Sequence, residues 1–321
     1  MSVRLVSFIS KGSRGAIRAG LLVGDIVVDL VALFEAGRAP RGAGQPMSVI
    51  ELLECDVCLN WAAELAADLD TVPDDARHSR HAVKLLSPIP NPGKILCMAT
   101  NYQSHLQESL SRRMLSDDNP TIETPRVFMK PSANTICGDG APILVTRQSR
   151  FVDYEGELAV IIGKRCRQVG IDEAMQYVGG VSCCNDISER RLRVWERPED
   201  KDWDKFFDWL NGKWMDNGFP MGPCVVPTRF ISDPHALDLQ TRVNGVVKQH
   251  ASTGEMIFDI AQTIAFISEI MTLEPGDVIA TGTPEGVGSS DGTNLKPGDV
   301  VEVEISEIGV LTNPVEAEAQ P

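Results

Sequence analysis

The chain has 321 residues, of which 43% are hydrophobic and 23% charged, a balance typical of a globular protein with a substantial core. Its net charge of −15 disfavours nucleic acid as a partner, because so acidic a surface repels a phosphate backbone. No apolar stretch approaches the roughly 20 residues that span a bilayer, and the first residues are typical of a strand and not of a signal peptide. We therefore expect a cytoplasmic protein with no membrane partner.

Residues 1–88 differ in composition from the rest of the chain, and we expect them to form a small α+β domain. Two strands that turn at Val23-Gly24-Asp25 are followed by helical patterns over Met47 to Cys58 and Trp61 to Leu69. The proline-rich segment 87–93 marks the boundary with a second domain, residues 89–321.

The second domain is rich in short strands and turns. Asn244-Gly245 predicts a β-hairpin, and an L-x-P-G-D-V pattern that occurs twice predicts two turns that each begin a strand. A helix is expected after Thr253 as its N-cap. The fold class we expect is a β-dominated α+β fold, not a doubly wound sheet.

Eight cysteines are spread along the chain, and Cys55 and Cys58 form a C-x-x-C pair. That pair lacks a second pair or nearby histidines that would complete a metal site, and it lies in a helical pattern. We expect reduced, mostly buried thiols.

The segment from Arg190 to Trp214 contains four of the five tryptophans among alternating charges. Lys205 to Leu210 could form a helical turn. Two interpretations remain open for this segment, a pocket wall or lid and an oligomer contact.

Three acidic residues alternate at the start of an apolar strand, Asp153, Glu155 and Glu157. Residues two apart on a strand share a face, and carboxylates that close are unfavourable unless they are solvated or bridged by a cation. Hard oxygen ligands suit Mg²⁺, Mn²⁺ or Ca²⁺, although a solvated edge strand would show the same pattern. Gly156 would let another chain segment approach the opposite face.

Two further segments carry candidate catalytic or substrate-binding residues. Asp186 follows an apolar strand and could complete a three-carboxylate site, with Arg190 four residues later to bind a carboxylate. His105 and Glu108 would share one face of a helical turn, as a general base and the group that orients it, or form an exposed ion pair.

The glycine-rich loop after Ile279 would present backbone N–H groups and the Thr283 hydroxyl to an anion. Its spacing fits neither a phosphate-binding P-loop nor a dinucleotide fingerprint.

The order of these segments is similar to that in the fumarylacetoacetate hydrolase family, over about residues 92–312. The motifs are N-Y-x-x-H-x-x-E from Asn101, F-M-K-P from Phe128, D-Y-E-G-E-L-A-V-I-I-G from Asp153, N-D-x-S-x-R from Asn185, G-K at Gly212 and T-G-T-P-E-G-V-G from Thr281. The resemblance implies a β-roll catalytic domain that forms a homodimer and binds Mg²⁺ or Mn²⁺. The segment Leu96–Thr100 lacks the additional metal-binding Asp of the founding hydrolase, so the chain resembles the three-carboxylate branch.

The resemblance also implies roles for individual residues. The metal ligands would be Glu155, Glu157 and Asp186. The catalytic residues would be His105, Glu108 and Lys213. The substrate contacts would be Arg190, Gly282, Thr283 and Lys130, the last of these with a less defined role.

From these roles we expect a metal-dependent hydrolase that cleaves a C–C bond in a β-diketo or acylpyruvate-type acid through a metal-bound enolate. The substrate partner would be a small anionic keto acid, from the catabolism of aromatic compounds. Isomerase, decarboxylase or hydratase chemistry on a 2-hydroxy-dienoate or 2-oxo acid uses the same enolate, so the ligands do not separate these reactions. A non-catalytic metal- or acid-binding module is a further alternative, disfavoured because a binder needs no base.

Overall fold

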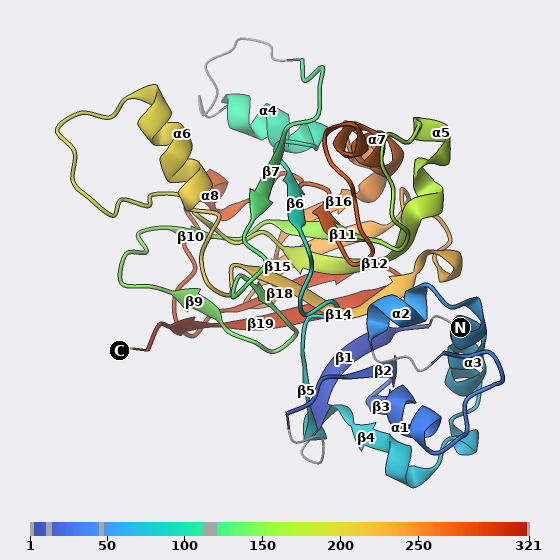
Figure 1. Cartoon of the computed structure of the whole chain (residues 1–321). Helices are drawn as coiled ribbons and strands as arrows, with labels where there is room; N and C mark the ends of the chain where they lie inside the picture. Colours follow the sequence, from blue (N-terminus) through green and yellow to red (C-terminus); the bar gives the residue numbers. More distant parts are fainter. Residues whose placement is uncertain (1–2, 11–14, 45–47, 112–120, 320–321) are drawn as a thin grey trace.

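The computed structural model describes residues 3–10, 15–44, 48–111 and 121–319 (Figure 1). Within these residues the strands form a twelve-stranded sheet, a five-stranded sheet and a two-stranded sheet. The β-dominated α+β fold that the sequence predicts is therefore confirmed. No helix among the described residues is long and apolar enough to cross a membrane.

The N-terminal unit, blue in Figure 1, is a sheet with helices packed on it. Its strands are β1 (Leu5–Ser10), β2 (Arg18–Val23), β3 (Ile26–Asp29), β4 (Arg77–Ser79) and β5 (Val83–Leu85), and its helices are α1 (Leu30–Glu35), α2 (Val49–Leu53) and α3 (Asp56–Ala67). The expected hairpin is confirmed as β2–β3, with Gly24 at φ 56°. The expected first helix ends at Leu53, five residues early, because Cys55 caps α3 and accepts a hydrogen bond from the Cys58 N–H at 3.2 Å. Its expected start, Met47, lies outside the described residues.

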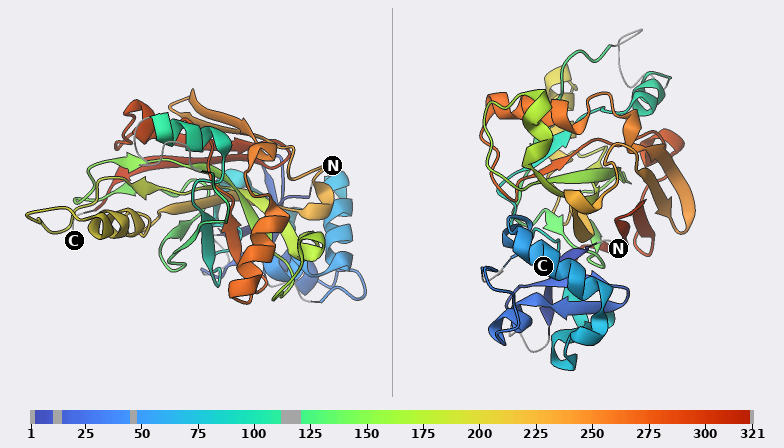
Figure 2. Two further views of the ribbon diagram at one scale, coloured as in Figure 1. Left: turned by 90° about the horizontal axis from the view of Figure 1, so that it is seen from above. Right: turned by 90° about the vertical axis from the view of Figure 1, so that its right-hand side faces the viewer.

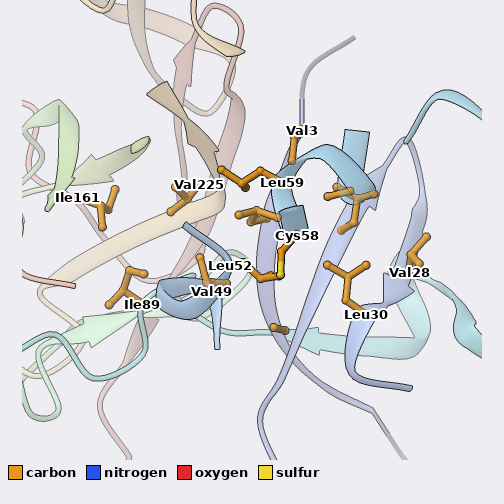
Figure 3. Close-up of a cluster of buried hydrophobic side chains, with 14 of the residues drawn as sticks. Val3, Val28, Leu30, Val49, Leu52, Cys58, Leu59, Ile89, Ile161 and Val225 are labelled. Atoms are coloured by element: carbon orange, nitrogen blue, oxygen red, sulfur yellow. The ribbon is translucent and has the colours of Figure 1, made fainter. Parts of the chain in front are cut away.

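One hydrophobic cluster joins the N-terminal unit to the large sheet. Leu52 of α2 and Leu59 of α3 lie in the same cluster as Ile161 and Val225 of the large sheet (Figure 3). Strand β1 also pairs with β14 (Phe219–Pro227) through Leu5 and Val225. Sheet pairing therefore runs across the expected domain boundary at residue 88, and that boundary stays a prediction.

The large sheet continues from β14 through β12, β11, β17 and β6 to β7, with β8 paired to the other side of β14. The bounds are β12 (Val178–Asn185), β11 (Gly156–Ile162), β17 (Val278–Ala280), β6 (Ile95–Met98), β7 (Val127–Lys130) and β8 (Ile136–Cys137). The second sheet has the order β16 (Val246–Ser252), β15 (Asp238–Val243), β18 (Val300–Ile305), β19 (Gly309–Ala317) and β9 (Ile143–Val145), and the third pairs β10 (Val152–Asp153) with β13 (Ser188–Glu189).

The turn predictions for this part of the chain are confirmed. Asn244 and Gly245, both with positive φ, connect β15 to β16. The two L-x-P-G-D-V turns precede β17 and β18. All eight cysteines are free thiols, six buried and two half-buried, as expected.

Helices and 3₁₀ turns cover the sheets. The α-helices are α4 (Gln103–Ser111), α5 (Ile171–Ala174), α6 (Asp202–Asn211), α7 (Ile260–Ile270) and α8 (Gly288–Asp291), and the 3₁₀ turns are Leu69–Thr71, Asp74–Ala76, Arg80–Ala82, Met175–Tyr177, Thr228–Phe230 and Thr253–Glu255. Thr253 is not the N-cap of the helix expected after it: the helix begins six residues later than expected, at Ile260, because Asp259 and Gln262 form a capping box there. Figures 1 and 2 show α4 and α6 on the side of the molecule away from the N-terminal unit.

The sheet order brings three distant segments to one edge. Strands β11 and β12 are antiparallel neighbours in which Gly156 pairs with Asn185 and Glu157 with Cys184. The start of β11 therefore lies beside the end of β12. Strand β17 pairs antiparallel with the other side of β11, so the loop that leaves β17 reaches the same edge.

Candidate active site

Three buried carboxylates meet at this edge. Glu155 precedes β11, Glu157 lies within it and Asp186 directly follows β12. One carboxylate oxygen from each residue lies within 4.8 Å of the others. The Asp186 N–H donates to the Glu155 carbonyl at 2.9 Å, which fixes the two segments to each other. The structure thus brings together all three residues expected to bind a metal.

The expected continuous strand over these acids is wrong in one respect. Strand β10 ends at Asp153 and β11 begins at Gly156, so Glu155 lies in a break between two strands. Asp153 is fully buried, and its carboxylate accepts from Arg190 Nε at 2.8 Å and from the N–H groups of Gly288 and Ser289 at 2.6 and 3.0 Å. It holds Arg190 and the loop after β17 in place, a role that the sequence did not reveal.

Cationic side chains hold two of the three carboxylates. Lys213 Nζ donates to Glu155 at 2.5 Å and to Asp186 at 2.8 Å, and Arg190 also binds Glu155. Lys130 Nζ donates to Asp186 and, at 2.9 Å, to the Ile187 carbonyl. Burial alone would lower the pKa of Lys213, but the Asp186 and Glu155 carboxylates raise it above its usual value, so the ammonium group stays charged.

Glu157 differs from its two neighbours. Its carboxylate accepts a hydrogen bond from the Gly282 N–H at 2.7 Å, and within the described residues it forms no ion pair. Burial raises its pKa well above the usual range, and the Asp186 and Glu155 carboxylates raise it further. The Lys213 charge offsets this only in part, so among the described residues Glu157 has no cationic partner of its own.

His105 and Glu108 lie on α4, and the helical turn expected there is confirmed. His105 Nδ1 is 3.5 Å from a Glu108 carboxylate oxygen. Glu108 also accepts from the Gly286 N–H at 3.1 Å. Burial alone would raise the pKa of Glu108, but the neighbouring His105 and Ser290 side chains and the hydrogen bond from the Gly286 N–H lower it below the usual value. The carboxylate is thus kept charged beside the imidazole.

The loop after β17 is held by hydrogen bonds to β11 and β16. Besides the Gly282 N–H bound to Glu157, the Thr283 hydroxyl donates to the Gly156 carbonyl at 2.9 Å and accepts from Gln249 Nε2 at 2.8 Å. Gln249 Oε1 accepts from the Gly156 N–H at 3.0 Å, so this side chain connects the loop to β11. Gln249 was missed in the sequence, because its hairpin pattern gives no indication of a partner in the loop.

One cavity of about 60 Å³ connects these groups. Its wall includes His105, Glu155, Glu157, Arg190, Lys213 and Thr283. The rings of Phe128 and Trp209, which meet edge to face with centroids 5.0 Å apart, also line it. Trp209 on α6 gives the tryptophan-rich segment a place in the pocket wall, while an oligomer contact there stays a prediction. Four of the expected site residues are not part of this wall in the described structure: Glu108, Lys130, Asp186 and Gly282.

The donor set fits a divalent cation. Three carboxylates offer hard oxygen ligands, which Mg²⁺, Mn²⁺ and Ca²⁺ prefer over zinc. Glu157, which has no cationic partner in the described structure, is where an added positive charge would gain most.

Comparisons with known proteins agree with this site. Residues 94–316 match the family described as "Fumarylacetoacetate (FAA) hydrolase C-terminal". A mitochondrial oxaloacetate tautomerase of Xenopus laevis is 36% identical over 98% of this chain and 91% of its own. The chain belongs to the fumarylacetoacetate hydrolase family, whose members are enzymes.

Two solved structures resemble this one over nearly the whole chain. A fumarylacetoacetate hydrolase from Exiguobacterium antarcticum has a TM-score of 0.73 and 30% identity, covering 99% of this chain and all of its own. A maleylpyruvate hydrolase from Sphingobium sp. SYK-6, in complex with manganese(II) and pyruvate, has a TM-score of 0.72 and 28% identity, covering 98% of this chain and all of its own. The family thus includes a tautomerase, hydrolases and, from Mycobacterium marinum, a 2-hydroxyhepta-2,4-diene-1,7-dioate isomerase.

Proposed function

We propose that this protein is a divalent-metal-dependent tautomerase that interconverts the keto and enol forms of a small 2-oxo acid, with oxaloacetate as the first candidate. One observation carries the proposal: Glu155, Glu157, His105 and Lys213 line a single cavity, and Asp186 lies in the same carboxylate cluster. The full-length similarity to an oxaloacetate tautomerase supports the choice of reaction.

The carboxylates Glu155, Glu157 and Asp186 would hold the metal, which when bound supplies Lewis-acid polarisation of the substrate's oxygens. Mn²⁺ is the first candidate because a related hydrolase is described with manganese and pyruvate. Mg²⁺ and Ca²⁺ fit the same oxygen ligands.

His105 would carry the proton. Its Nδ1 lies near Glu108, which leaves Nε2 to exchange a proton with the substrate. Conversion of the keto form removes a proton from C3, and the electron pair of the broken C–H bond forms the C2–C3 double bond. The C2 oxygen takes up a proton to give the enol, so atoms and charge balance.

Lys213 would stabilise the charge that develops on the C2 oxygen. Because its pKa is raised, the ammonium group acts as a fixed positive charge and not as a base. Arg190 holds Glu155 and borders the cavity, and from there it would add to the positive field.

A second candidate is hydrolysis of a C–C bond in a β-diketo or acylpyruvate-type acid. The observation that favours it is the charged Glu108 carboxylate beside His105, an arrangement suited to activating a water molecule. The similarity to a maleylpyruvate hydrolase supports this alternative as well.

The test separates the two reactions by their products. Enol-oxaloacetate is diluted into buffer with enzyme, and loss of its enol absorbance is followed with Mn²⁺, Mg²⁺ or Ca²⁺ and with EDTA. Maleylpyruvate and acylpyruvates are assayed in parallel, and cleaved acids are identified. Metal-dependent ketonisation without cleavage supports the tautomerase, and metal-dependent cleavage supports the hydrolase. Catalysis that survives exhaustive chelation would overturn both.

Glu155→Gln is the matched variant for this assay, and Glu274→Gln, on the exposed surface beside Arg165, is its control. We expect the first to lose metal-dependent catalysis and the second to retain it. Assembly as a homodimer, which the proposal does not require, can be checked by light scattering on the same sample.

A further inference from the structure

Cys55 and Cys58 lie one helical turn apart at the start of α3. Cys55 is the N-cap residue of this helix, and Cys58 follows three residues later in its first turn. The Cys55 Sγ accepts a hydrogen bond from the Cys58 N–H at 3.2 Å, so the Cys55 side chain is folded over that turn. In the described structure neither residue lines the active-site cavity, and a role for the pair is therefore independent of the proposed function.

The separation of the two residues suits a disulfide. Cα atoms three residues apart in a helical turn are roughly 5 Å apart, and disulfides join Cα atoms that are about 4.4–6.8 Å apart. Both thiols are free, so the structure shows the reduced state of the pair. Oxidation can therefore join the two sulfurs with little movement of the backbone.

The two thiols differ in their access to solvent. Cys55 is half-buried, whereas Cys58 lies in the hydrophobic cluster that joins the N-terminal unit to the large sheet (Figure 3). Burial, and after it the neighbouring Cys55 side chain, raises the pKa of the Cys58 thiol to about 12. A small molecule can thus reach Cys55 but not Cys58, which stays a protonated thiol in the reduced pair.

The helix supplies a group that stabilises negative charge on Cys55. N–H groups in the first turn of a helix have no intrahelical partner and carry its partial positive charge. One of them already donates to the Cys55 sulfur. Because the thiolate and not the thiol attacks a disulfide, Cys55 is the attacking sulfur of the pair and Cys58 the one that resolves the product.

We propose that Cys55 and Cys58 form a thiol–disulfide exchange site that reacts with small-molecule disulfides. The Cys55 thiolate attacks a disulfide R–S–S–R, which gives a mixed disulfide and releases one R–S⁻. The Cys58 sulfur then attacks the Cys55 sulfur, which forms the protein disulfide and releases the second R–S⁻. The two electrons and two protons that the cysteines lose are carried away by two molecules of R–SH. An excess of a reducing thiol reverses both steps.

The test uses a tryptic peptide that contains both thiols. Residues 42–77 form one such peptide, with Cys55 and Cys58 and no other cysteine. The folded full chain is treated with bis(2-hydroxyethyl) disulfide, an uncharged reagent that the flanking Glu54 and Asp56 do not repel. Remaining thiols are alkylated at low pH, and the digest is analysed by mass spectrometry.

We expect the wild-type peptide to lose two hydrogen atoms and to escape alkylation, and to regain both thiols after excess dithiothreitol. Cys58→Ser should instead retain the mixed disulfide on Cys55. Cys55→Ser should form a mixed disulfide at least about tenfold more slowly than Cys58→Ser, because Cys58 is buried. Cys137→Ser is the matched control and should leave the protein disulfide unchanged, because Cys137 is the other half-buried thiol and has no cysteine three residues away.

The wild-type measurement does not depend on whether a variant folds. A wild-type peptide that keeps two alkylated thiols after treatment would overturn the inference. A mixed disulfide that forms as fast in Cys55→Ser as in Cys58→Ser would overturn the assignment of Cys55 as the attacking sulfur, and with it the exchange site.

Discussion

The Gly282 N–H donates to the Glu157 carboxylate at 2.7 Å, while lysine ammonium groups hold the other two carboxylates of the site. Gly282 can direct its N–H there because its φ of 96° suits glycine and because a Cβ at this position would lie 2.7 Å from the Asn101 Cβ. Glu157 is therefore held by a neutral donor in a buried site, and a bound metal would supply the missing charge.

Replacement of Glu157 should change metal affinity and the stability of the metal-free protein in opposite directions. We expect Glu157→Gln to abolish metal binding but to raise the Tm of the metal-free protein at neutral pH by about 2–4 °C, corresponding to about 1 kcal/mol. The glutamine is neutral and can still accept from Gly282. Calorimetric titration with Mn²⁺ and thermal unfolding in EDTA measure the two effects.

The pH dependence follows from the raised pKa of Glu157. A carboxyl group whose pKa is higher in the folded state stabilises the fold below its unfolded pKa, and that stabilisation is lost as the pH rises toward the folded value. The Tm advantage of the variant in EDTA should therefore be small near pH 4.5 and grow with pH. An advantage that shrinks with rising pH would contradict this account.

Lys130 is proposed to position the Asp186 carboxylate, and its replacement tests this role. Its Nζ is buried and binds Asp186 and the Ile187 carbonyl, and in the described structure it does not line the cavity. Loss of one partner from a buried ion pair typically costs about 3–5 kcal/mol. We expect Lys130→Met to lower the free energy of unfolding in EDTA by that amount and to weaken metal binding, measured by denaturant titration and calorimetry.

Lys164→Met, at an exposed position, is the control for Lys130→Met and should change neither quantity. The resemblance suggested that Lys130 contacts the substrate. If that were its role, the main effect would be a higher KM at saturating metal with stability unchanged, and such a result would rule out the positioning role.

The proposed role of His105 in proton transfer can be tested by replacing its imidazole. We expect His105→Gln to lower kcat by about 10²–10⁴ while Mn²⁺ affinity stays close to that of the wild type, because the imidazole lies outside the carboxylate cluster. The matched control is His250→Gln, because His250 is an exposed histidine on β16 that pairs with Asp238 of β15. Near-normal turnover of the His105 variant would show that another group moves the proton.

Much of the site is predictable because each piece has a local pattern. Glu155 and Glu157 are two residues apart in one motif, Asp186 follows an apolar strand, and His105 and Glu108 are three residues apart on a helix. These patterns depend on strand and helix geometry, which neighbouring residues largely determine.

The hydrogen bonds and ion pairs that join these segments could not be predicted, because they connect residues far apart in the sequence. Lys130 binds Asp186 across 56 residues, and Gln249 reaches Gly156 across 93. The resemblance assigned no role to Asp153, yet this residue binds Arg190 and the loop after β17. Such partners depend on how the sheets pack, and a single sequence does not show which polar groups the packing will bring together.

The last prediction concerns the close contact between Gly156 and Thr241. The sequence indicated that another segment approaches this glycine, and the structure identifies that segment as β15. A Cβ at Gly156 would lie 2.0 Å from the Thr241 Oγ1, so one of the two chain segments must shift if a side chain is added. We expect Gly156→Ala to lower Tm and, because Glu155 and Glu157 flank this residue, to weaken Mn²⁺ binding as well.

Thr241→Ala should relieve part of that effect, because it removes Oγ1 and leaves the Thr241 Cβ at 3.3 Å. A double-mutant cycle measured by thermal unfolding and Mn²⁺ titration gives the coupling energy, which for residues in contact is about 0.5–3 kcal/mol. Additive effects of the two substitutions would show that the contact with Thr241 is not the reason for the loss.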